Sequence, residues 1–226
     1  MSAVASGSAE AAAAPRLKIA EIFSSIQGEA AHVGWPTVFV RLTGCPLRCV
    51  WCDTAYAFQG GEWMEISGIL ETVAAAGVRH VCVTGGEPLS QRACLVLLTG
   101  LCDAGYVVSL ETSGALDVSD VDARVHKVID IKTPGSGESE RNLPGNLDHL
   151  GPNDALKFVL ADRADFDWAR DFVRDRSLDA RCEVLFSPVW ETLPAAQLAD
   201  WIVDERLPVR LQLQLHKVLW GDEPGR

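Results

Sequence analysis

The stretch that decides the fold of this chain is residues 37–54, TVFVRLTGCPLRCVWCDT. Its first part, Thr37 to Leu42, is a short apolar run that predicts a buried strand. Its second part follows the strand directly and places Cys45, Cys49 and Cys52 within one short loop. Because parallel α/β folds bind ligands at the carboxyl ends of their strands, this loop marks the expected functional edge of a sheet.

Strand-like and helix-like segments alternate along the rest of the chain. Apolar runs predict strands, and apolar residues three or four positions apart predict helices. The expected strands are 37–42, 80–84, 106–111, 127–132, 156–160, 183–186 and 209–215. The expected helices cover about 66–76, 94–104, 162–176 and 194–205. Residues 133–152 are rich in Gly, Pro, Asn and Ser and are expected to form a long loop.

This alternation predicts an α/β fold with a mostly parallel sheet. Six or seven strands are too few to close an eight-stranded barrel, so we expect an incomplete, open (β/α) barrel. Residues 16–226 are expected to form one domain. The polar segments 84–88, 111–114, 132–134 and 187–188 each follow an expected strand. They should therefore meet the cysteine loop at one rim.

Composition excludes several classes of partner. The 226 residues carry 31 acidic and 20 basic side chains, a formal net charge of -11. Such a chain is a poor candidate for nucleic-acid binding, and it has no Lys/Arg cluster for anionic lipid. Residues 1–15 lack the basic start and apolar core of a secretory signal and are expected to be a disordered tail. No apolar run reaches the length of a membrane span, so we expect a cytoplasmic protein.

The cysteines favour an iron–sulfur cluster. There are seven, an odd number, and only three are clustered, as expected in a reducing compartment. The clustered three have the spacing Cys-x3-Cys-x2-Cys, and three thiolates on a four-iron cube leave one iron open for a ligand. A structural zinc site needs a fourth ligand that is not nearby, and a disulfide leaves one thiol over. Zinc, a disulfide or chance clustering remain alternatives on spacing alone.

The cysteine spacing resembles the signature of the radical S-adenosylmethionine superfamily. That superfamily also carries a Gly-Gly-Glu motif after its second strand, and residues 84–88 here read TGGEP. The resemblance implies a 4Fe–4S cluster whose open iron is chelated by the amino and carboxylate groups of S-adenosylmethionine. It also implies reductive cleavage of that cofactor to a 5′-deoxyadenosyl radical, which abstracts hydrogen from a substrate.

Further segments resemble the 7-carboxy-7-deazaguanine synthase family. They are EIFSSIQGE (21–29), VFVRLTGC (38–45), CDTAYAF (52–58) and LQLHK (213–217). The resemblance runs from about Ala20 to Trp220. It implies conversion of 6-carboxy-5,6,7,8-tetrahydropterin to 7-carboxy-7-deazaguanine with release of ammonia, in queuosine or deazapurine biosynthesis. It also implies that S-adenosylmethionine is regenerated and that Mg²⁺ assists.

The resemblance assigns roles to residues of this chain. Implied substrate contacts are Ile26, Gln27, Gly28, Arg41 and Thr84, and the implied magnesium ligand is Thr54. Implied S-adenosylmethionine contacts are Trp51, Cys52, Asp53, Gly86, Asp130, Ile131, Lys132, Ser187, Pro188, Val189 and Trp190. Chemistry supports Arg41 independently, because a guanidinium grips a carboxylate with two hydrogen bonds. The alternative is a strand-end arginine paired with a surface carboxylate.

Some positions depart from the family pattern. Many members carry Ser-Pro-Lys where this chain has Asp130-Ile131-Lys132, and residues 187–190 and 218–226 also differ. His216 is expected to be structural. Two alternative functions remain: an activase that makes a glycyl radical on a protein partner, and a non-catalytic zinc or iron–sulfur module. The resemblance further implies a flavodoxin or ferredoxin as electron donor and a homodimer.

Overall fold

The computed structural model describes residues 14–221, 223 and 225, so almost all of the expected tail, 1–15, lies outside the described residues. The strands are β1 (Arg16–Ile26), β2 (Pro36–Leu42), β3 (Glu62–Glu65), β4 (His80–Gly85), β5 (Val107–Thr112), β6 (His126–Ile131), β7 (Ala155–Leu160), β8 (Glu183–Pro188) and β9 (Arg210–Leu211). The helices are α1 (Ile66–Ala75), α2 (Cys94–Asp103), α3 (Arg163–Arg176), α4 (Ala195–Asp204) and α5 (Leu215–Trp220).

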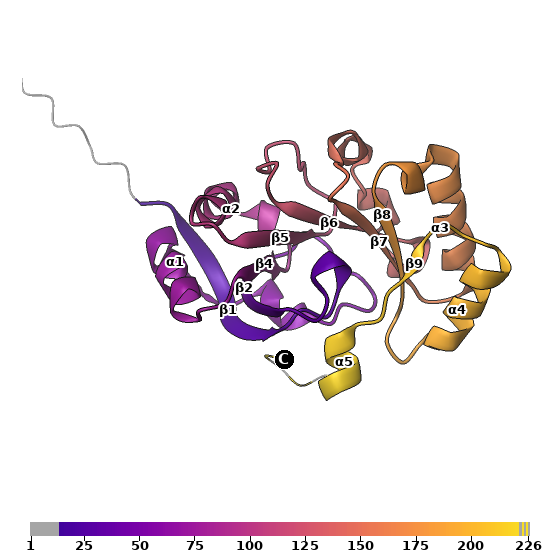
Figure 1. Cartoon of the computed structure of the whole chain (residues 1–226), viewed down its shortest axis with the longest axis horizontal. Helices are drawn as coiled ribbons and strands as arrows, with labels where there is room; N and C mark the ends of the chain where they lie inside the picture. Colours follow the sequence, from indigo (N-terminus) through magenta and orange to yellow (C-terminus); the bar gives the residue numbers. More distant parts are fainter. Residues whose placement is uncertain (1–13, 222, 224, 226) are drawn as a thin grey trace, which may run out of the picture.

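The nine strands of the described chain form one sheet in the order β3-β1-β2-β4-β5-β6-β7-β8-β9 (Figure 1). From β2 to β9 neighbouring strands are parallel, while β1 pairs antiparallel with both β2 and β3. The strands β3 and β9 lie at opposite ends of this order and do not pair. The sheet is therefore open, which confirms the incomplete (β/α) barrel.

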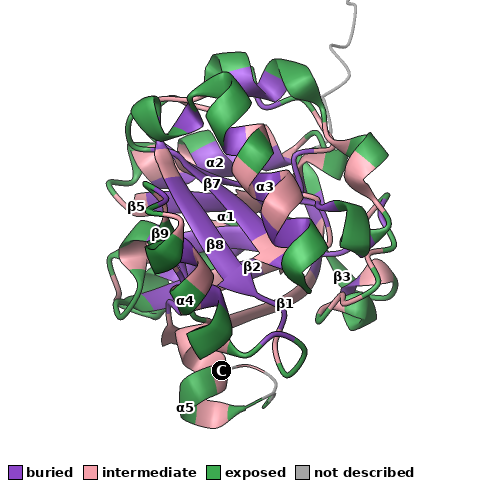
Figure 2. Cartoon of the chain, turned by 90° about the vertical axis from the view of Figure 1, so that its right-hand side faces the viewer, coloured by how far each residue is buried: buried purple, intermediate pink, exposed green. Residues whose placement is uncertain are grey.

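The core lies between the sheet and the helices. Figure 2 shows the strands buried and the outer sides of the helices exposed. Helix α2 buries four apolar side chains and exposes Val96, as helical spacing requires. Phe158 on β7 contacts the rings of Phe172 and Phe186 at 5.8 and 5.5 Å between centroids. No helix in the described part of the chain is long and apolar enough to cross a membrane.

Two expectations about strands were wrong. β1 and β3 were missed because they form the antiparallel edge: β3 is almost wholly exposed, and most of β1 is only half-buried. The expected strand 209–215 is shortened to Arg210–Leu211 and is followed by α5. Beyond Leu211 the Gln212 N–H still donates to the Phe186 carbonyl of β8 at 2.9 Å, and the buried Gln212 side chain accepts from the backbone N–H of Ala30 at 2.6 Å with its Oε1. The chain then turns into α5 instead of continuing along the sheet.

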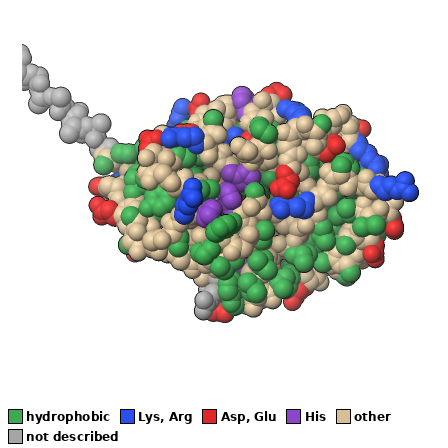
Figure 3. Space-filling view, viewed as in Figure 1, with side chains coloured by type: hydrophobic (Ala, Val, Ile, Leu, Met, Phe, Trp, Pro, Cys, Tyr) green, Lys and Arg blue, Asp and Glu red, His purple; other side chains and the backbone are tan. Residues whose placement is uncertain are grey.

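The amino ends of the parallel strands are closed by residues 27–35, here called the floor segment. Ala30 of this segment packs against Val128 and other small and apolar side chains of the inner sheet face. Below it, the ring of His32 lies 5.2 Å from those of both His80 and His126. Figure 3 shows histidine side chains gathered on this face of the molecule. The floor segment thus covers the amino end of the sheet, opposite the end that carries the cysteine loop.

Candidate active site

A cavity of about 620 Å³ occupies the interior of the sheet. Inward-facing side chains of β2, β4, β5, β6 and β7 line it, together with the cysteine loop, residues 189–192 and α5. The floor segment closes it from below. Its polar and charged lining includes Gln27, Glu29, Arg41, Asp53, Thr54, Thr84, Glu111, Asp130, Lys132, Lys157, Gln214, His216 and Lys217.

The cysteine loop holds its shape through backbone contacts. Gly44 has a φ of +97°, a conformation that favours glycine, and its N–H donates to the Ala57 carbonyl at 2.8 Å. The N–H of Cys52 donates to the Cys49 carbonyl at 3.2 Å and closes a turn. Cys45, Cys49 and Cys52 all line the cavity with partly exposed thiols, and none forms a disulfide. The loop therefore presents three thiols to one space.

This donor set fits a 4Fe–4S cluster. Burial raises the pKa of the Cys45 and Cys49 thiols, so these groups need a cation to become thiolates, and cluster iron supplies one. Among the described residues, no three His, Cys, Asp or Glu side chains are placed to hold one metal ion. A cube does not require such convergence, because each cysteine binds a different iron.

The Gly-Gly-Glu turn packs directly on the cysteine loop. The N–H of Glu87 donates to the Gly44 carbonyl at 2.7 Å, and a Cβ at Gly86 would collide with that same carbonyl. The buried Glu87 carboxylate accepts from the Thr112 hydroxyl at 2.9 Å and the Ser113 N–H at 2.7 Å. Glu87 therefore joins the loops after β4 and β5, a structural role that the sequence did not reveal.

Arg41 points into the cavity from β2 and is held in place. Its Nε–H donates to Glu21 at 2.7 Å, and the Tyr56 hydroxyl donates to the same carboxylate at 2.8 Å. Burial opposes the charge of Arg41, but Tyr56 and Glu21 outweigh it and raise its pKa. The expected alternative, pairing with a carboxylate, thus occurs. In the described part of the chain, Arg41 donates to this carboxylate through its Nε–H. Its two terminal nitrogens therefore remain available to a ligand.

The bottom of the cavity is a buried polar network centred on Glu29. Its carboxylate accepts from Lys157 Nζ at 2.7 Å and from the side-chain amides of Gln212 and Gln214, each at 3.0 Å. The backbone N–H of Glu29 donates to Gln27 Oε1 at 3.2 Å. Burial alone would raise the pKa of Glu29, but Lys157 and the hydrogen bond from Gln214 lower it to about 2. The carboxylate is therefore ionised and anchors Glu29, whose backbone N–H in turn holds the Gln27 side chain.

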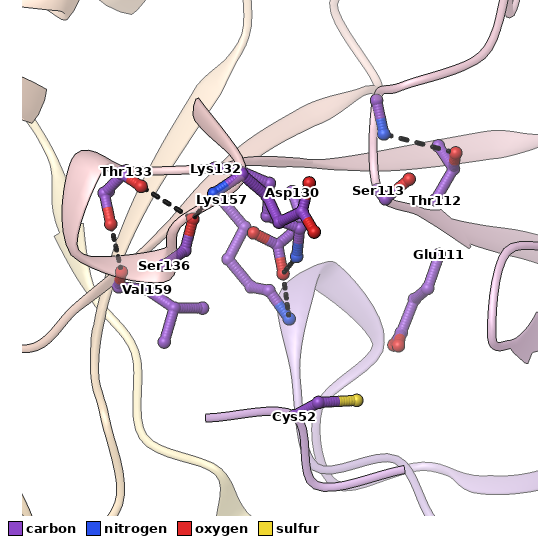
Figure 4. Close-up of polar contacts among 12 residues, drawn as sticks. Cys52, Glu111, Thr112, Ser113, Asp130, Lys132, Thr133, Ser136, Lys157 and Val159 are labelled. Atoms are coloured by element: carbon purple, nitrogen blue, oxygen red, sulfur yellow. Dashed lines mark hydrogen bonds and ion pairs between the residues drawn. The ribbon is translucent and has the colours of Figure 1, made fainter. Parts of the chain in front are cut away.

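The strands β5 to β7 carry further charged side chains, among them Glu111, Asp130 and Lys157 (Figure 4). Asp130 Oδ2 lies 3.1 Å from Lys132 Nζ and 3.7 Å from Lys157 Nζ. Its other oxygen, Oδ1, is buried and has no hydrogen-bond partner. Glu111 accepts from the Thr84 hydroxyl at 3.4 Å, and burial raises its pKa. Both carboxylates line the cavity, so both can accept hydrogen bonds from a donor-rich ligand.

The residues after Cys52 extend the loop beside α5. Trp51, Cys52, Asp53 and Thr54 all line the cavity. The Thr54 hydroxyl lies 3.9 Å from Cys52 Sγ, and Asp53 forms an ion pair with Lys217 of α5 at 3.3 Å. A hard hydroxyl oxygen is thus adjacent to the thiol group, at a place where a Mg²⁺ ion can retain waters or ligand oxygens.

The structure brings most residues singled out in the sequence to this cavity. The lining includes Ile26, Gln27, Arg41, Cys45, Cys49, Trp51, Cys52, Asp53, Thr54, Thr84, Gly86, Asp130, Lys132, Val189 and Trp190. Gly28, Ile131, Ser187 and Pro188 are not part of it. Ile131 instead joins the hydrophobic core, because neighbouring strand residues face opposite sides. The space beside Gly28 is filled by the ring of His216.

Sequence reasoning assigned no role to several polar lining residues, among them Glu29, Lys157 and Gln214, and it expected Glu111 at this rim only as part of the segment 111–114. A signal for Lys157 was present, because it interrupts the apolar run of β7 and alternates with apolar neighbours. Gln214 had no such signal. It reaches the cavity only because the chain turns between β9 and α5.

The comparisons agree with this geometry. The model of the radical SAM superfamily matches residues 39–131, the part that contains the cysteine loop, the Gly-Gly-Glu turn and Asp130. The chain is thus a radical S-adenosylmethionine enzyme that carries a 4Fe–4S cluster. The 7-carboxy-7-deazaguanine synthase of Chlorobaculum tepidum is 46% identical over 92% of this chain and 96% of its own length. That of Koribacter versatilis is 41% identical over 92% and 98%. The chain belongs to the 7-carboxy-7-deazaguanine synthase family.

Solved structures support the fold. QueE from Escherichia coli superposes with a TM-score of 0.74 at 23% identity, covering 89% of this chain and 95% of that one. SuiB from Streptococcus suis bound to its precursor peptide SuiA gives 0.57 at 14% identity, covering 78% and 48%. The shared part is the open barrel.

Proposed function

We propose that this protein is a carbon–nitrogen lyase that converts 6-carboxy-5,6,7,8-tetrahydropterin to 7-carboxy-7-deazaguanine with release of ammonia. The observation that carries the proposal is a single cavity that combines three cysteine thiols with the guanidinium of Arg41. Membership of the 7-carboxy-7-deazaguanine synthase family supports the same reaction. Its place would be in queuosine or another deazapurine pathway.

Arg41 binds the substrate carboxylate through its terminal N–H groups, while Glu21 keeps the guanidinium aimed. Thr84 lies beside Arg41 in the β2–β4 register and contacts the same substrate. Ile26, Gln27 and Gly28 form the turn under the pterin. The amide of Gln27 both donates and accepts, which suits the edge of a pterin ring. The substrate is thus held from the wall and from the floor.

S-adenosylmethionine occupies the part of the cavity beside the cysteine loop. When bound, the cluster and this cofactor supply a 5′-deoxyadenosyl radical that takes hydrogen from the substrate. Gly86 exposes backbone to the methionine end, and Lys132 binds its carboxylate. Trp51, Cys52 and Asp53 border the adenine. We assign further contacts to Asp130, Ile131, Ser187, Pro188, Val189 and Trp190. Asp130, Val189 and Trp190 line the cavity, whereas the other three lie within two positions of lining residues in the sequence.

Thr54 is the proposed Mg²⁺ ligand, with substrate oxygens and water completing the shell. The electron donor is a small redox protein such as a flavodoxin or a ferredoxin. We further propose a homodimer in the cytoplasm, with residues 16–226 as one domain. Thr54, the donor, the dimer and the domain each rest on the family relation.

The deciding experiment is anaerobic reconstitution with iron and sulfide, followed by incubation with 6-carboxytetrahydropterin, reductant, Mg²⁺ and S-adenosylmethionine. Formation of 7-carboxy-7-deazaguanine supports the proposal. A cluster spectrum that responds to S-adenosylmethionine without that product would refute the substrate and keep the superfamily. Such a result would favour another radical reaction, including glycyl-radical activation. One zinc per chain and no cluster after reconstitution would refute both.

A further inference from the structure

Four charged side chains of alternating sign cross the inside of the cavity. Glu29 on the floor pairs with Lys157 at 2.7 Å, Lys157 lies 3.7 Å from Asp130, and Asp130 pairs with Lys132 at 3.1 Å. All four side chains are at most 18% exposed and all line the cavity. The series therefore runs continuously from the floor segment to the strand end near the cysteine loop.

The two ends of this series serve different parts of the cavity. The backbone N–H of Glu29 holds the Gln27 side chain, and its carboxylate binds Gln212 and Gln214 of the chain that leads into α5. Lys132 is at the other end, where its charge acts on the pKa of the Cys49 thiol. Lys157 is the only one of the four that touches both the floor segment and β6.

Lys157 also compensates the negative charge of two buried carboxylates, those of Glu29 and Asp130. Burial alone would lower its pKa, but Glu29, Asp130 and Glu111 raise the pKa well above the usual lysine value. Removing one partner from a buried ion pair leaves the other uncompensated, and such a group moves toward water or takes up a proton. Asp130 Oδ1 is already without a hydrogen-bond partner. If Lys157 is removed, Asp130 therefore keeps only its ion pair with Lys132 among the ion pairs of the described residues.

We propose that Lys157 is a positioning residue that holds the floor turn at Glu29 and the β6 carboxylate of Asp130 in one fixed arrangement. The inference rests on the proposed function, because those two groups border the pterin and the cofactor respectively. With Lys157 in place, the distance between the substrate carbon that loses hydrogen and the 5′-deoxyadenosyl radical is fixed. Without it, the floor shifts relative to β6, and cofactor cleavage no longer leads efficiently to product.

The test compares Lys157→Met with a matched control, Lys127→Met. Lys127 on β6 forms an equally buried pair with Asp154, 2.9 Å long, and it does not line the cavity. For Lys157→Met we expect an unchanged cluster spectrum, a pterin KM raised at least tenfold and more 5′-deoxyadenosine formed per product. For Lys127→Met we expect lower thermal stability with KM and that ratio unchanged. Lys157→Arg, which keeps the charge, should restore most of the coupling.

A second readout does not depend on turnover. Hydrogen exchange of the apo-protein should be at least tenfold faster at the Ala30 amide in Lys157→Met, because the Glu29–Gln212 network that supports it loosens. The same amide should be unaffected in Lys127→Met. This readout still tests the proposal if the wild-type protein does not turn over the pterin, an outcome that counts against the proposed function alone.

Three results would overturn the inference. One is a folded Lys157→Met variant with wild-type KM, product ratio and Ala30 exchange. Another is an equal change in Lys127→Met, which would reduce Lys157 to a general contributor to stability. If Lys157→Met does not fold, Lys157→Gln and Lys157→Arg replace it. The third result is then a glutamine variant that behaves like wild type while the arginine variant does not.

Discussion

Polar side chains in the cavity are held by partners before any ligand arrives. Arg41 is oriented by Glu21, and Glu29 by Lys157 and two glutamine amides. Pairing in a buried site keeps these groups charged and fixes their geometry, which is the arrangement that favours selective binding of a charged substrate. The consequences for single residues can be measured.

Replacing Arg41 with alanine should abolish most pterin turnover and leave the cluster in place. Loss of a buried charged partner costs about 2–5 kcal/mol, roughly 30- to 5,000-fold in kcat/KM. Steady-state kinetics and the visible spectrum of the reconstituted protein check this. Arg41→Lys should recover only part of the activity, because lysine cannot form two parallel hydrogen bonds. Loss of the cluster in Arg41→Ala would show that the Glu21 pair serves structure alone.

Removing the Thr54 hydroxyl should weaken stimulation by Mg²⁺. Thr54→Val keeps the side-chain shape and removes the hard oxygen donor, so we expect the Mg²⁺ concentration for half-maximal activity to rise roughly tenfold, about 1.4 kcal/mol. A magnesium titration of product formation measures it. Thr54→Ser retains a hydroxyl and should behave like wild type. An unchanged titration in Thr54→Val would remove Thr54 from the magnesium site.

At the scale of secondary-structure elements, the contact that shapes the cluster-binding rim is formed between two loops. The turn after β4 lies against the cysteine loop, and Glu87 then ties it to the loop after β5. Three loops are thereby combined into one rigid rim. Glycine is needed at the contact because backbone meets backbone there.

Gly86→Ala should therefore destabilise the rim, since its methyl group collides with the Gly44 carbonyl. Overpacking of this kind costs about 1–3 kcal/mol, and cluster content after reconstitution should fall. Urea unfolding and iron analysis measure the two effects. Gly100→Ala, in the middle of α2 with 3.6 Å to the nearest Leu70 atom, is the control and should stabilise by about 0.5–1 kcal/mol. Equal behaviour of the two variants would contradict the proposed contact.

At the scale of the whole molecule, the barrel is open along its edges but closed at its amino end. The floor segment provides this closure, with Ala30 facing the inner sheet and His32 between His80 and His126. A closed end makes the interior a cavity rather than a channel. Because three histidines meet at this closed end, the stability of the protein is expected to depend on pH.

Burial, together with the charges of His126 and His80, lowers the pKa of His32 from 6.5 to about 4. The unfolded chain thus binds a proton below pH 6.5 that the folded chain refuses. Stability should be constant above about pH 6.5 and fall between pH 6.5 and 4. Because His32 is half-exposed, we expect a loss of roughly 1–2 kcal/mol rather than the full linkage value. Urea unfolding at pH 7 and 5 measures this.

The matched variants are His32→Gln and His149→Gln. The first removes the titrating group in the floor segment and should reduce the loss of stability between pH 7 and 5, with the part due to the lowered pKa values of His80, His126 and His216 remaining. The second, outside the cluster, should leave the pH dependence intact. A wild-type protein as stable at pH 5 as at pH 7 would contradict the account.

The sequence by itself determined the parallel strands from β2 to β8, the open barrel and the iron–sulfur loop. These follow from local signals: apolar runs, helical spacing and three cysteines in one loop with few alternatives. It also located Arg41, because the charge lies four positions before Cys45. The antiparallel edge strands β1 and β3 carry weak local signals, and their pairing partners supply what their own pattern lacks.

Only the tertiary structure decided the bottom of the cavity. Lys157 and Gln214 lie 128 and 185 residues after Glu29 in the sequence, and no local pattern relates the three. They meet because the floor segment, β7 and the turn before α5 enclose one low-dielectric space, in which each charge needs a partner. The cysteine loop can be predicted because its residues are close together in the sequence. This network cannot, because its residues become neighbours only when the chain folds.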